Sequence, residues 1–306
     1  LTYGATGTTS LLRVQSFLAE RVLTDDGLLL GGLALMLVGF AFKVGAVPFH
    51  SWTPDVYQGA PTPITGFMAA CTKLAAFGVI LRVTYVGVSA SRWDWSDGLW
   101  AIAAITMVVG AVLSVTQTDV KRLLAYSSIA HAGFILVGVL AFSQAAIGGV
   151  MFYLVAYGFA TVAAFGIIAM VRQGGSEASH LSQWAGLGRR HPVVAGAFSF
   201  LLLAFAGIPL TSGFTAKFAA FAPAVEAGTG GVVLVVIAVL ASAVTAFVYV
   251  RLIVLMYFTE ASTEEGDEVV ALTPSIPSTI GITVGVLVTA VLGIVPGFLL
   301  DIASSA

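Results

Sequence analysis

Three of the four lysines lie inside apolar stretches of the sequence, where an amine can bind and release a proton. Lys43 stands in GFAFKVGAVPFH, Lys73 in MAACTKLAAFGV and Lys217 in GFTAKFAAF. An unpaired ammonium group at the centre of a bilayer costs about 3 kcal/mol on insertion scales, so such a residue marks a functional path by default. We therefore predict that these lysines face a polar interior. The alternative is that each side chain extends to the membrane interface.

Glycine and proline interrupt the stretches that carry Lys43 and Lys217. Gly45 and Pro48 follow Lys43 directly, and the segment 207–213, with one proline and two glycines, precedes Lys217. Proline removes a backbone donor and breaks a helix, so both segments are predicted to free backbone carbonyls. Interrupted helices in both halves of a chain point to the ion site of a transporter.

A histidine in AYSSIAHAGFILVG is the next group that can carry a proton. His131 follows Ser127 by four residues, so the two share a helix face, and Tyr126 lies beside Ser127. Histidine titrates near neutrality, so a hydroxyl–imidazole pair predicts a proton relay. The alternative is a core histidine with satisfied hydrogen bonds. His50 would share a face with Lys43 if the helix continued through the break.

Composition narrows the class of protein. Only 9% of the 306 residues are charged and 58% are hydrophobic, whereas soluble domains carry roughly 25% charged residues. The mean hydropathy is +1.02 and the net charge is −2, which excludes a soluble, disordered or nucleic-acid-binding protein. A single cysteine excludes a disulfide framework. Neither metal-ligand spacing nor a glycine-rich phosphate loop is present, so we expect no cofactor or metal in this chain.

The positions of the apolar residues predict an all-α, polytopic transmembrane helical bundle. A spanning helix needs about 20 mainly apolar residues. Eight windows of that kind occur: 28–47, 62–88, 98–116, 123–141, 145–171, 192–222, 230–258 and 277–300. Lys121, the fourth lysine, falls in a predicted loop.

Basic residues in the short loops predict the orientation. Lys121 and Arg122 lie in one link, and Arg172, Arg189 and Arg190 lie in another on the same side. The positive-inside rule assigns that side to the cytoplasm and both termini to the outside. The polar link 174–191 has Leu181, Trp184 and Leu187 at a spacing of three, which predicts a short helix along the membrane surface or an ordinary linker with an interfacial tryptophan.

The lysines lack an acidic partner within the spans. Asp55 and Glu226 stand at span ends, and no other carboxylate lies nearer a span centre. An opposite charge within about 4–6 Å holds a lysine in its charged state, so we expect the partner on another chain, on a missing segment, or replaced by water. Because the sequence begins LTYGATGTTS, without an initiator methionine, we expect a fragment that starts midway through a larger protein.

Several motifs resemble one family of membrane proteins. The stretch 42–67, FKVGAVPFHSWTPDVYQGAPTPITGF, is similar to the antiporter-like membrane subunits of respiratory complex I, and DVYQGAPTP looks most like the subunit N type of bacterial NADH-quinone oxidoreductase. Sister subunits and cation/proton antiporters share only the PFHxWxPD core. Further matches follow in order along the chain: 72–83, 117–138, 180–192 and 206–218.

The resemblance implies an antiporter-like fold of two inverted repeats, each with a broken helix. The chain would be a single membrane domain, 1–306, that supplies the C-terminal part of this fold. Residues 1–97 would end the first repeat, 98–260 would form the second with the interfacial link 174–191, and 261–306 would contribute an acidic loop and the terminal helix.

The resemblance also implies roles for individual residues. It assigns a proton relay to Lys43, Lys73, His131 and Lys217. It adds accessory positions at His50, Tyr126 and Ser127. Quinone reduction elsewhere in the complex would shift an ion pair at Lys43, and protons would then pass through Lys73, His131 and water to Lys217.

The function implied is that of a proton-translocating membrane subunit of NADH-quinone oxidoreductase in the bacterial plasma membrane. It would be part of an enzyme without carrying redox chemistry, since NADH, FMN, iron–sulfur clusters and quinone would belong to other subunits. Its partners would be complex I membrane subunits on both sides, the lipid bilayer, protons and internal water, without nucleic acid. The alternatives are a subunit of a cation/proton antiporter and a purely structural member of the membrane arm.

Overall fold

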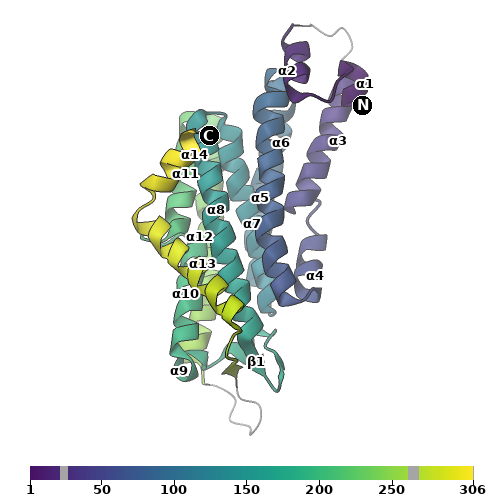
Figure 1. Cartoon of the computed structure of the whole chain (residues 1–306). Helices are drawn as coiled ribbons and strands as arrows, with labels where there is room; N and C mark the ends of the chain where they lie inside the picture. Colours follow the sequence, from purple (N-terminus) through teal and green to yellow (C-terminus); the bar gives the residue numbers. More distant parts are fainter. Residues whose placement is uncertain (21–26, 261–268, 306) are drawn as a thin grey trace.

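The computed structural model describes residues 1–20, 27–260 and 269–305, which are mostly helical (Figure 1). The long helices are α3 (Gly27–Val44), α5 (Thr62–Arg82), α6 (Arg92–Val115), α7 (Val120–Ala141), α8 (Gln144–Met170), α12 (Thr229–Phe258) and α13 (Ile276–Ile294). The shorter ones are α1 (Thr2–Thr6), α2 (Leu11–Glu20), α4 (Trp52–Gly59), η1 (Val83–Gly87), η2 (Ser89–Ser91), η3 (Leu181–Trp184), α9 (Leu187–Arg190), α10 (Pro192–Ala206), α11 (Ser212–Glu226) and α14 (Gly297–Ser305). The predicted acidic loop at 261–268 lies outside the described residues.

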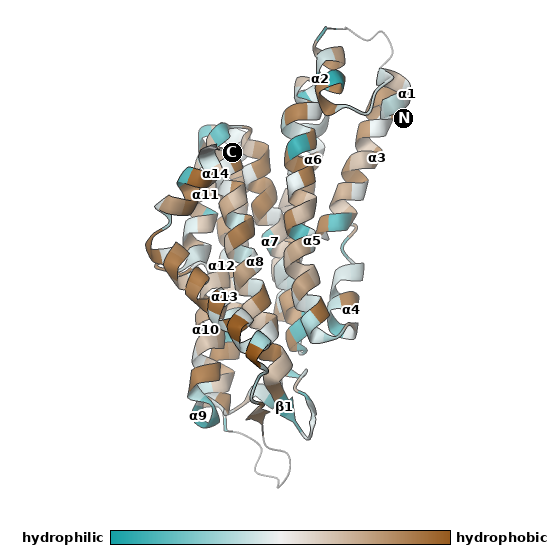
Figure 2. Ribbon diagram, in the orientation of Figure 1, coloured by the Kyte–Doolittle hydropathy of each residue, from teal (hydrophilic) through white to brown (hydrophobic). Residues whose placement is uncertain are grey.

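The predicted helical membrane bundle is confirmed. Seven helices among the described residues are long and apolar enough to cross a membrane. They match seven of the eight predicted windows. The remaining window, 192–222, is divided between α10 and α11. In Figure 2 the long helices are mostly white to brown, as expected for segments surrounded by lipid and by one another.

Helix starts follow from local chemistry. The side chain of Asp119 accepts a hydrogen bond from the backbone N–H of Arg122 at 2.8 Å, which caps α7. Ser143 caps α8 in the same way through the N–H of Ala146 at 3.2 Å. Pro192 begins α10, where its missing N–H costs nothing.

Helix α7 lies at the centre of the bundle. In its apolar window 89% of the residues are buried within the chain, against 17% in α13. It packs against α4, α6, α8, α11 and α12, whereas α13 runs obliquely across α8 on the outside (Figure 1). Side chains on α7 are therefore held in the protein interior.

The connections predicted to share one side of the membrane lie together. The N–H of Val120 donates to the carbonyl of Ser179 at 2.8 Å, and the N–H of Leu181 donates to the carbonyl of Thr118 at 2.7 Å. Both described ends of the chain lie at the opposite end of the bundle from α9 and β1 (Figure 1). The assignment of the α9 end to the cytoplasm stays a prediction.

A small sheet follows α8 at that end. Its strand order is β2 (Ser176–Glu177), β1 (Val171–Gln173), β3 (Val270–Ala271), all antiparallel. Gly174 and Gly175 have φ angles of 57° and 78°. A two-residue hairpin loop needs such left-handed residues, which explains the two glycines.

The link 174–191 differs from the expected surface helix. Leu181, Trp184 and Leu187 lie in η3 and α9 and are buried within the chain. Trp184 stacks on Phe198 with ring centroids 4.9 Å apart and donates from Nε1 to the carbonyl of Ala178 at 2.9 Å. Their apolar face packs into the protein and is not available to the membrane surface. The spacing of three reflects packing against α10 and α12.

Lys121 also differs from its prediction, because it belongs to the first turn of α7 and is buried. Its Nζ lies 3.4 Å from Oε1 of Glu177 on β2, and it donates to the carbonyl of Ala60 and to Oγ1 of Thr62, both at 3.3 Å. The β1–β2 hairpin places the carboxylate of Glu177 beside Lys121, and its negative charge offsets the cost of burying the ammonium group. The pair therefore ties the α4–α5 turn to α7.

Replacing Glu177 with glutamine is expected to lower the free energy of unfolding by about 1–3 kcal/mol, because the buried ammonium of Lys121 loses its counter-charge. Thermal unfolding of the full-length protein in detergent measures the change. Glu226→Gln is the matched control, since Glu226 is exposed at the end of α11. Equal melting temperatures for Glu177→Gln and the control would contradict a stabilising role for the pair.

Candidate functional site

The first predicted break is present between α3 and α4. Helix α3 ends at Val44, Gly45 has a φ angle of 74°, and α4 begins at Trp52. A Cβ on residue 45 would lie 2.6 Å from Oγ1 of Thr53, so glycine is required for both conformation and space. The carbonyl of Val44, freed by the break, accepts a hydrogen bond from Nζ of Lys73 at 3.2 Å. Lys73, on α5, is buried as predicted.

Lys43 does not face a polar interior within this chain. It stands in the last turn of α3, where the helix dipole favours a cation, and its side chain is exposed. The two ion pairs found among the described residues involve Lys121 and Arg122 instead. His50 is half-buried in the turn between the helices, and its Nδ1 is buried without a hydrogen-bond partner. Lys43 and His50 would share a face only if the helix continued, and α3 ends at Val44 as the predicted break requires.

The second predicted break is present between α10 and α11. Helix α10 ends at Ala206, Gly207 has a φ angle of 82°, and α11 begins at Ser212. Nζ of Lys217 on α11 donates to the carbonyl of Ala206 at 2.8 Å and to that of Phe205 at 3.0 Å. It also donates to Oγ of Ser242 on α12 at 2.6 Å. Three acceptors match the three N–H donors of an ammonium group.

At both breaks a lysine amine donates hydrogen bonds to backbone carbonyls, but the two lysines lie on different kinds of helix. In each half, an amine bonds carbonyls at the C-terminal end of the first half-helix. Lys73 comes from the continuous helix after the break, whereas Lys217 comes from the second half-helix itself. Ser242, on α12, contributes from the helix that follows the second break, as α5 follows the first. Lys217 has three acceptors and Lys73 has the carbonyl of Val44, and neither amine is paired with a carboxylate among the described residues.

His131 lies buried on α7 with a hydroxyl group at each ring nitrogen. Nδ1 is 2.8 Å from Oη of Tyr153, and Nε2 is 3.4 Å from Oη of Tyr249. The hydroxyl of Tyr249 is also hydrogen-bonded to Ser127. The predicted Ser127–His131 pair is therefore bridged by Tyr249. An imidazole with a hydroxyl on each side can accept a proton at one nitrogen and release one from the other.

Tyr126 takes no part in this cluster. Its side chain interacts with the guanidinium of Arg122, one turn earlier on α7. Arg122 also lies 2.7 Å from Oδ1 of Asp55, so Tyr126 joins a polar group at the end of the bundle. Tyr126 and His131 are five residues apart on α7, so their side chains point about 140° apart around the helix axis. The accessory role of Tyr126 stays a prediction.

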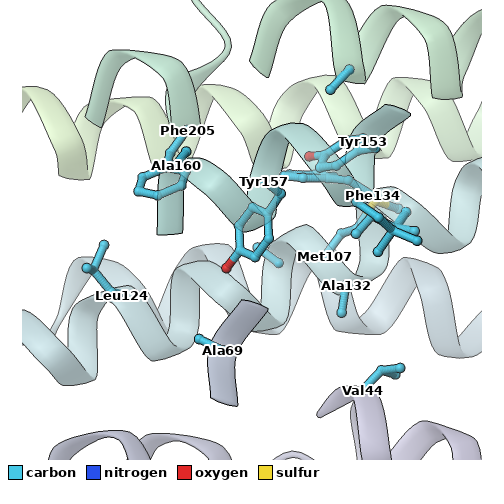
Figure 3. Close-up of a cluster of buried hydrophobic side chains, with 14 of the residues drawn as sticks. Val44, Ala69, Met107, Leu124, Ala132, Phe134, Tyr153, Tyr157, Ala160 and Phe205 are labelled. Carbon is cyan, nitrogen blue, oxygen red and sulfur yellow. The ribbon is translucent and has the colours of Figure 1, made fainter. Parts of the chain in front are cut away.

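Aromatic rings surround His131. Tyr157, Phe134 and Phe205 have ring centroids 4.8, 5.5 and 5.8 Å from that of the imidazole, and Figure 3 shows these three side chains with Tyr153 in the buried interior. A small cavity beside His131 offers about 10 Å³ to the centre of a water molecule and is bounded by residues of α8, α10 and α11. That is the room of about one water. Nζ of Lys217 lies 5.1 Å from the centroid of Phe134.

Sequence reasoning missed the tyrosines and Ser242. Tyr153 and Tyr157 stand four residues apart within the apolar window of α8, and Tyr249 stands within that of α12. A hydroxyl in the middle of a span, repeated at helical spacing, was the available signal. Among residues 1–20, 27–260 and 269–305, no group of three His, Cys, Asp or Glu side chains could hold a metal ion.

Comparisons with known proteins identify the family of this chain. The family model described as "NADH:quinone oxidoreductase/Mrp antiporter, TM" matches residues 1–245. A protein of Streptomyces griseus subsp. griseus named NADH-quinone oxidoreductase subunit N 3 is 58% identical over 297 residues, covering 97% of this chain and 52% of that protein. The chain thus spans about half the length of this relative.

Solved structures show the same fold. A chain of respiratory complex I from Thermus thermophilus with bound aureothin has a TM-score of 0.79 and 33% identity, covering 98% of this chain and 62% of that one. A chain of the Mrp complex from Dietzia sp. DQ12-45-1b has a TM-score of 0.83 at 22% identity, covering 100% and 63%. The second likeness bears on the fold alone.

Proposed function

Because the chain belongs to the family of NADH:quinone oxidoreductase and Mrp antiporter membrane subunits, we propose that it is part of a proton-translocating subunit of NADH-quinone oxidoreductase. The observation that carries the proton-translocating role is the pair of broken helices whose freed carbonyls hold buried lysine amines. The 58% identity to a relative named subunit N of that enzyme supports the assignment to it rather than to an antiporter. The enzyme's redox reaction would take place on other subunits.

The proposed path runs from Lys43 through Lys73 and His131 to Lys217. The last three are buried. Nζ of Lys217 lies 5.1 Å from the ring centroid of Phe134, which is 5.5 Å from that of His131. A proton placed on any one of the three disfavours a proton on its neighbours, because like charges repel strongly where water is excluded. Transfer from group to group would therefore be driven by changes in charge at the start of the path. His50 and Ser127 would assist as accessory groups.

Lys43 would take its acidic partner from outside the described residues. Its ammonium is exposed on this chain, and an uncompensated charge at that place in a membrane is costly. A carboxylate from another segment or subunit would offset this cost. Making or breaking that ion pair would change the charge at the beginning of the path and so start the transfer.

The proposed setting is the bacterial plasma membrane, with membrane subunits of the complex on both sides of this one. Seven apolar helices support a multi-pass membrane protein, and the subunit N relative is bacterial. The basic links around Lys121 and around Arg189 would face the cytoplasm. NADH, FMN, iron–sulfur clusters and quinone would be bound by other subunits.

The alternative is a subunit of a cation/proton antiporter, which the fold of the Mrp chain supports. Purification of the full-length protein from its native membrane in mild detergent distinguishes the two. We expect flavin and iron–sulfur absorbance to co-purify with it. A cofactor-free complex that exchanges sodium for protons in vesicles would favour the antiporter.

Replacing Lys73 with methionine tests the relay at its first buried member. We expect NADH-driven proton uptake into proteoliposomes to fall about tenfold, because proton-transferring groups contribute at least that much to rate. Methionine keeps the length of the side chain but can neither carry a proton nor donate to the carbonyl of Val44. Cys71→Ser is the control, since Cys71 is exposed two residues earlier on the same helix. Native uptake in Lys73→Met would remove Lys73 from the path.

A further inference from the structure

Three buried hydroxyl groups lie between the first broken helix and His131. Oη of Tyr57, on α4, is 3.3 Å from Oγ of Ser128 on α7. The hydroxyl of Tyr157, on α8, adjoins that of Ser128, and the Tyr157 ring centroid is 4.8 Å from that of His131. Tyr57, Ser128 and Tyr157 are buried. Ser128 precedes His131 by three residues, so both face the same side of α7.

Tyr157 stands next to a contact between α8 and α5, the helix that carries Lys73. Ala70 packs on α8 at Gly158, where a Cβ would be 3.9 Å from that of Ala70. Lys73 is one turn further along α5, and Tyr157 adjoins Gly158. Figure 3 shows the Tyr157 hydroxyl directed away from Phe205 and toward the side on which Ala69 lies. The Tyr157 hydroxyl thus points toward α5, the helix that carries Lys73, while the Tyr157 ring centroid lies 4.8 Å from that of His131.

Simple packing does not require this arrangement. Phenylalanine and alanine would fill the same space without oxygen atoms that must find partners away from water. Here the partners are hydroxyls contributed by three different helices. Each hydroxyl has one proton to donate and lone pairs to accept another, which is the property needed to pass a proton along.

We propose that Tyr57, Ser128 and Tyr157 form a hydroxyl bridge that passes protons between the Lys73 turn and His131. The inference rests on the proposed proton path and adds residues to it. Each oxygen accepts a proton from one neighbour as its own proton moves to the next, so only O–H and N–H bonds form and break. The transfer between Tyr157 and His131 passes through a water in the small cavity that both residues line. No electrons are transferred and no further reactant is needed. The hydroxyls then rotate back before the next proton.

The bridge gives α4 a role in the proposed proton path, because none of the relay lysines lies on this helix. Tyr57 is the bridge member from the second half of the broken helix. A shift of α4 relative to α7 would lengthen the 3.3 Å contact of Tyr57 with Ser128. Ser128 would then bond Tyr157 alone, so the first broken helix would regulate how His131 is reached.

The test uses Ser128→Ala, Tyr157→Phe and Tyr57→Phe in the full-length protein within its assembled complex. NADH-driven proton uptake into proteoliposomes is measured per electron transferred, in H₂O and in D₂O. We expect Ser128→Ala and Tyr157→Phe to lower uptake about tenfold and to raise the solvent isotope effect, with a smaller loss for Tyr57→Phe. Ser128→Thr, which restores the hydroxyl, should recover most of the uptake.

Tyr85→Phe is the matched control, because Tyr85 donates its hydroxyl to the carbonyl of Val139 at 3.1 Å, outside this cluster. Native uptake and isotope effect in Tyr157→Phe and Ser128→Ala, with Lys73→Met inactive, would overturn the bridge but leave the proposed function. If Lys73→Met also pumps normally, the proposed function fails with it. If Ser128→Ala does not assemble, the two Tyr→Phe variants decide, since each removes one oxygen and keeps its ring.

Discussion

Replacing Lys217 with methionine is expected to reduce proton translocation by the assembled complex by at least about tenfold. The amine is the group that connects the buried histidine region to the second break, and it bonds Phe205, Ala206 and Ser242. Methionine fills a similar volume but neither donates a hydrogen bond nor carries a proton. Proton uptake into proteoliposomes, driven by NADH and calibrated with an ionophore, measures the loss.

An arginine at the same position separates the titrating role from the structural one. Its guanidinium can still donate to the two carbonyls but does not release its proton in proteins. We expect Lys217→Arg to pump as poorly as Lys217→Met while melting closer to the native temperature. Efficient pumping by Lys217→Arg would show that Lys217 acts only by holding α10 and α11 together.

Lys121→Met is the control for loss of a buried lysine. Lys121 is paired with Glu177 at the end of the bundle, outside the proposed path. We expect it to lower stability without changing the number of protons moved per electron. A loss of pumping equal to that of Lys217→Met would mean that general destabilisation, and not the relay, explains the effect.

Replacing Gly213 with alanine is expected to destabilise the protein by at least about 3 kcal/mol, the upper range for overpacking. A Cβ on this residue of α11 would lie 1.8 Å from the carbonyl oxygen of Ala204 and 2.7 Å from its carbon. Backbone atoms cannot rotate away, so α10 and α11 must separate. The hydrogen bonds from Lys217 to Phe205 and Ala206 would lengthen as a result. Thermal unfolding in detergent and the amount of assembled complex report the change.

Gly78→Ala provides the matched control for this substitution. Gly78 lies within α5, and no atom lies within 4 Å of a Cβ placed there. Alanine is a better helix former than glycine by about 1 kcal/mol, so we expect unchanged or slightly higher stability. If Gly213→Ala unfolded at the same temperature as Gly78→Ala, the close approach of α10 and α11 would not limit the size of residue 213.

Much of the fold was predictable because it follows from local sequence. A run of about 20 apolar residues has no stable form in lipid other than a helix that satisfies its own backbone. Gly45 with Pro48, and Gly207 with Pro209, determine where two of these helices stop. The link 174–191 was harder to predict, because leucines and a tryptophan at a spacing of three give the same pattern whether that face contacts lipid or protein.

The candidate site was predictable only in part. A lysine or a histidine in an apolar run is visible in the sequence because its burial is costly. Its partners are not visible, since they come from distant segments: Tyr249 is 118 residues from His131, and Val44 is 29 residues from Lys73. These contacts depend on how the helices pack and rotate. The same reason explains why Ser127 reaches His131 only through Tyr249.

The sequence by itself determined that this is a helical membrane protein with two broken helices and a few titratable groups in its spans, because apolar runs, prolines and buried charges act locally. The tertiary structure decided what those groups touch. It placed Lys73 and Lys217 on carbonyls at the two breaks and left Lys43 exposed. It also surrounded His131 with tyrosines from α8 and α12, because helix packing determines which distant polar atoms can satisfy one another away from water.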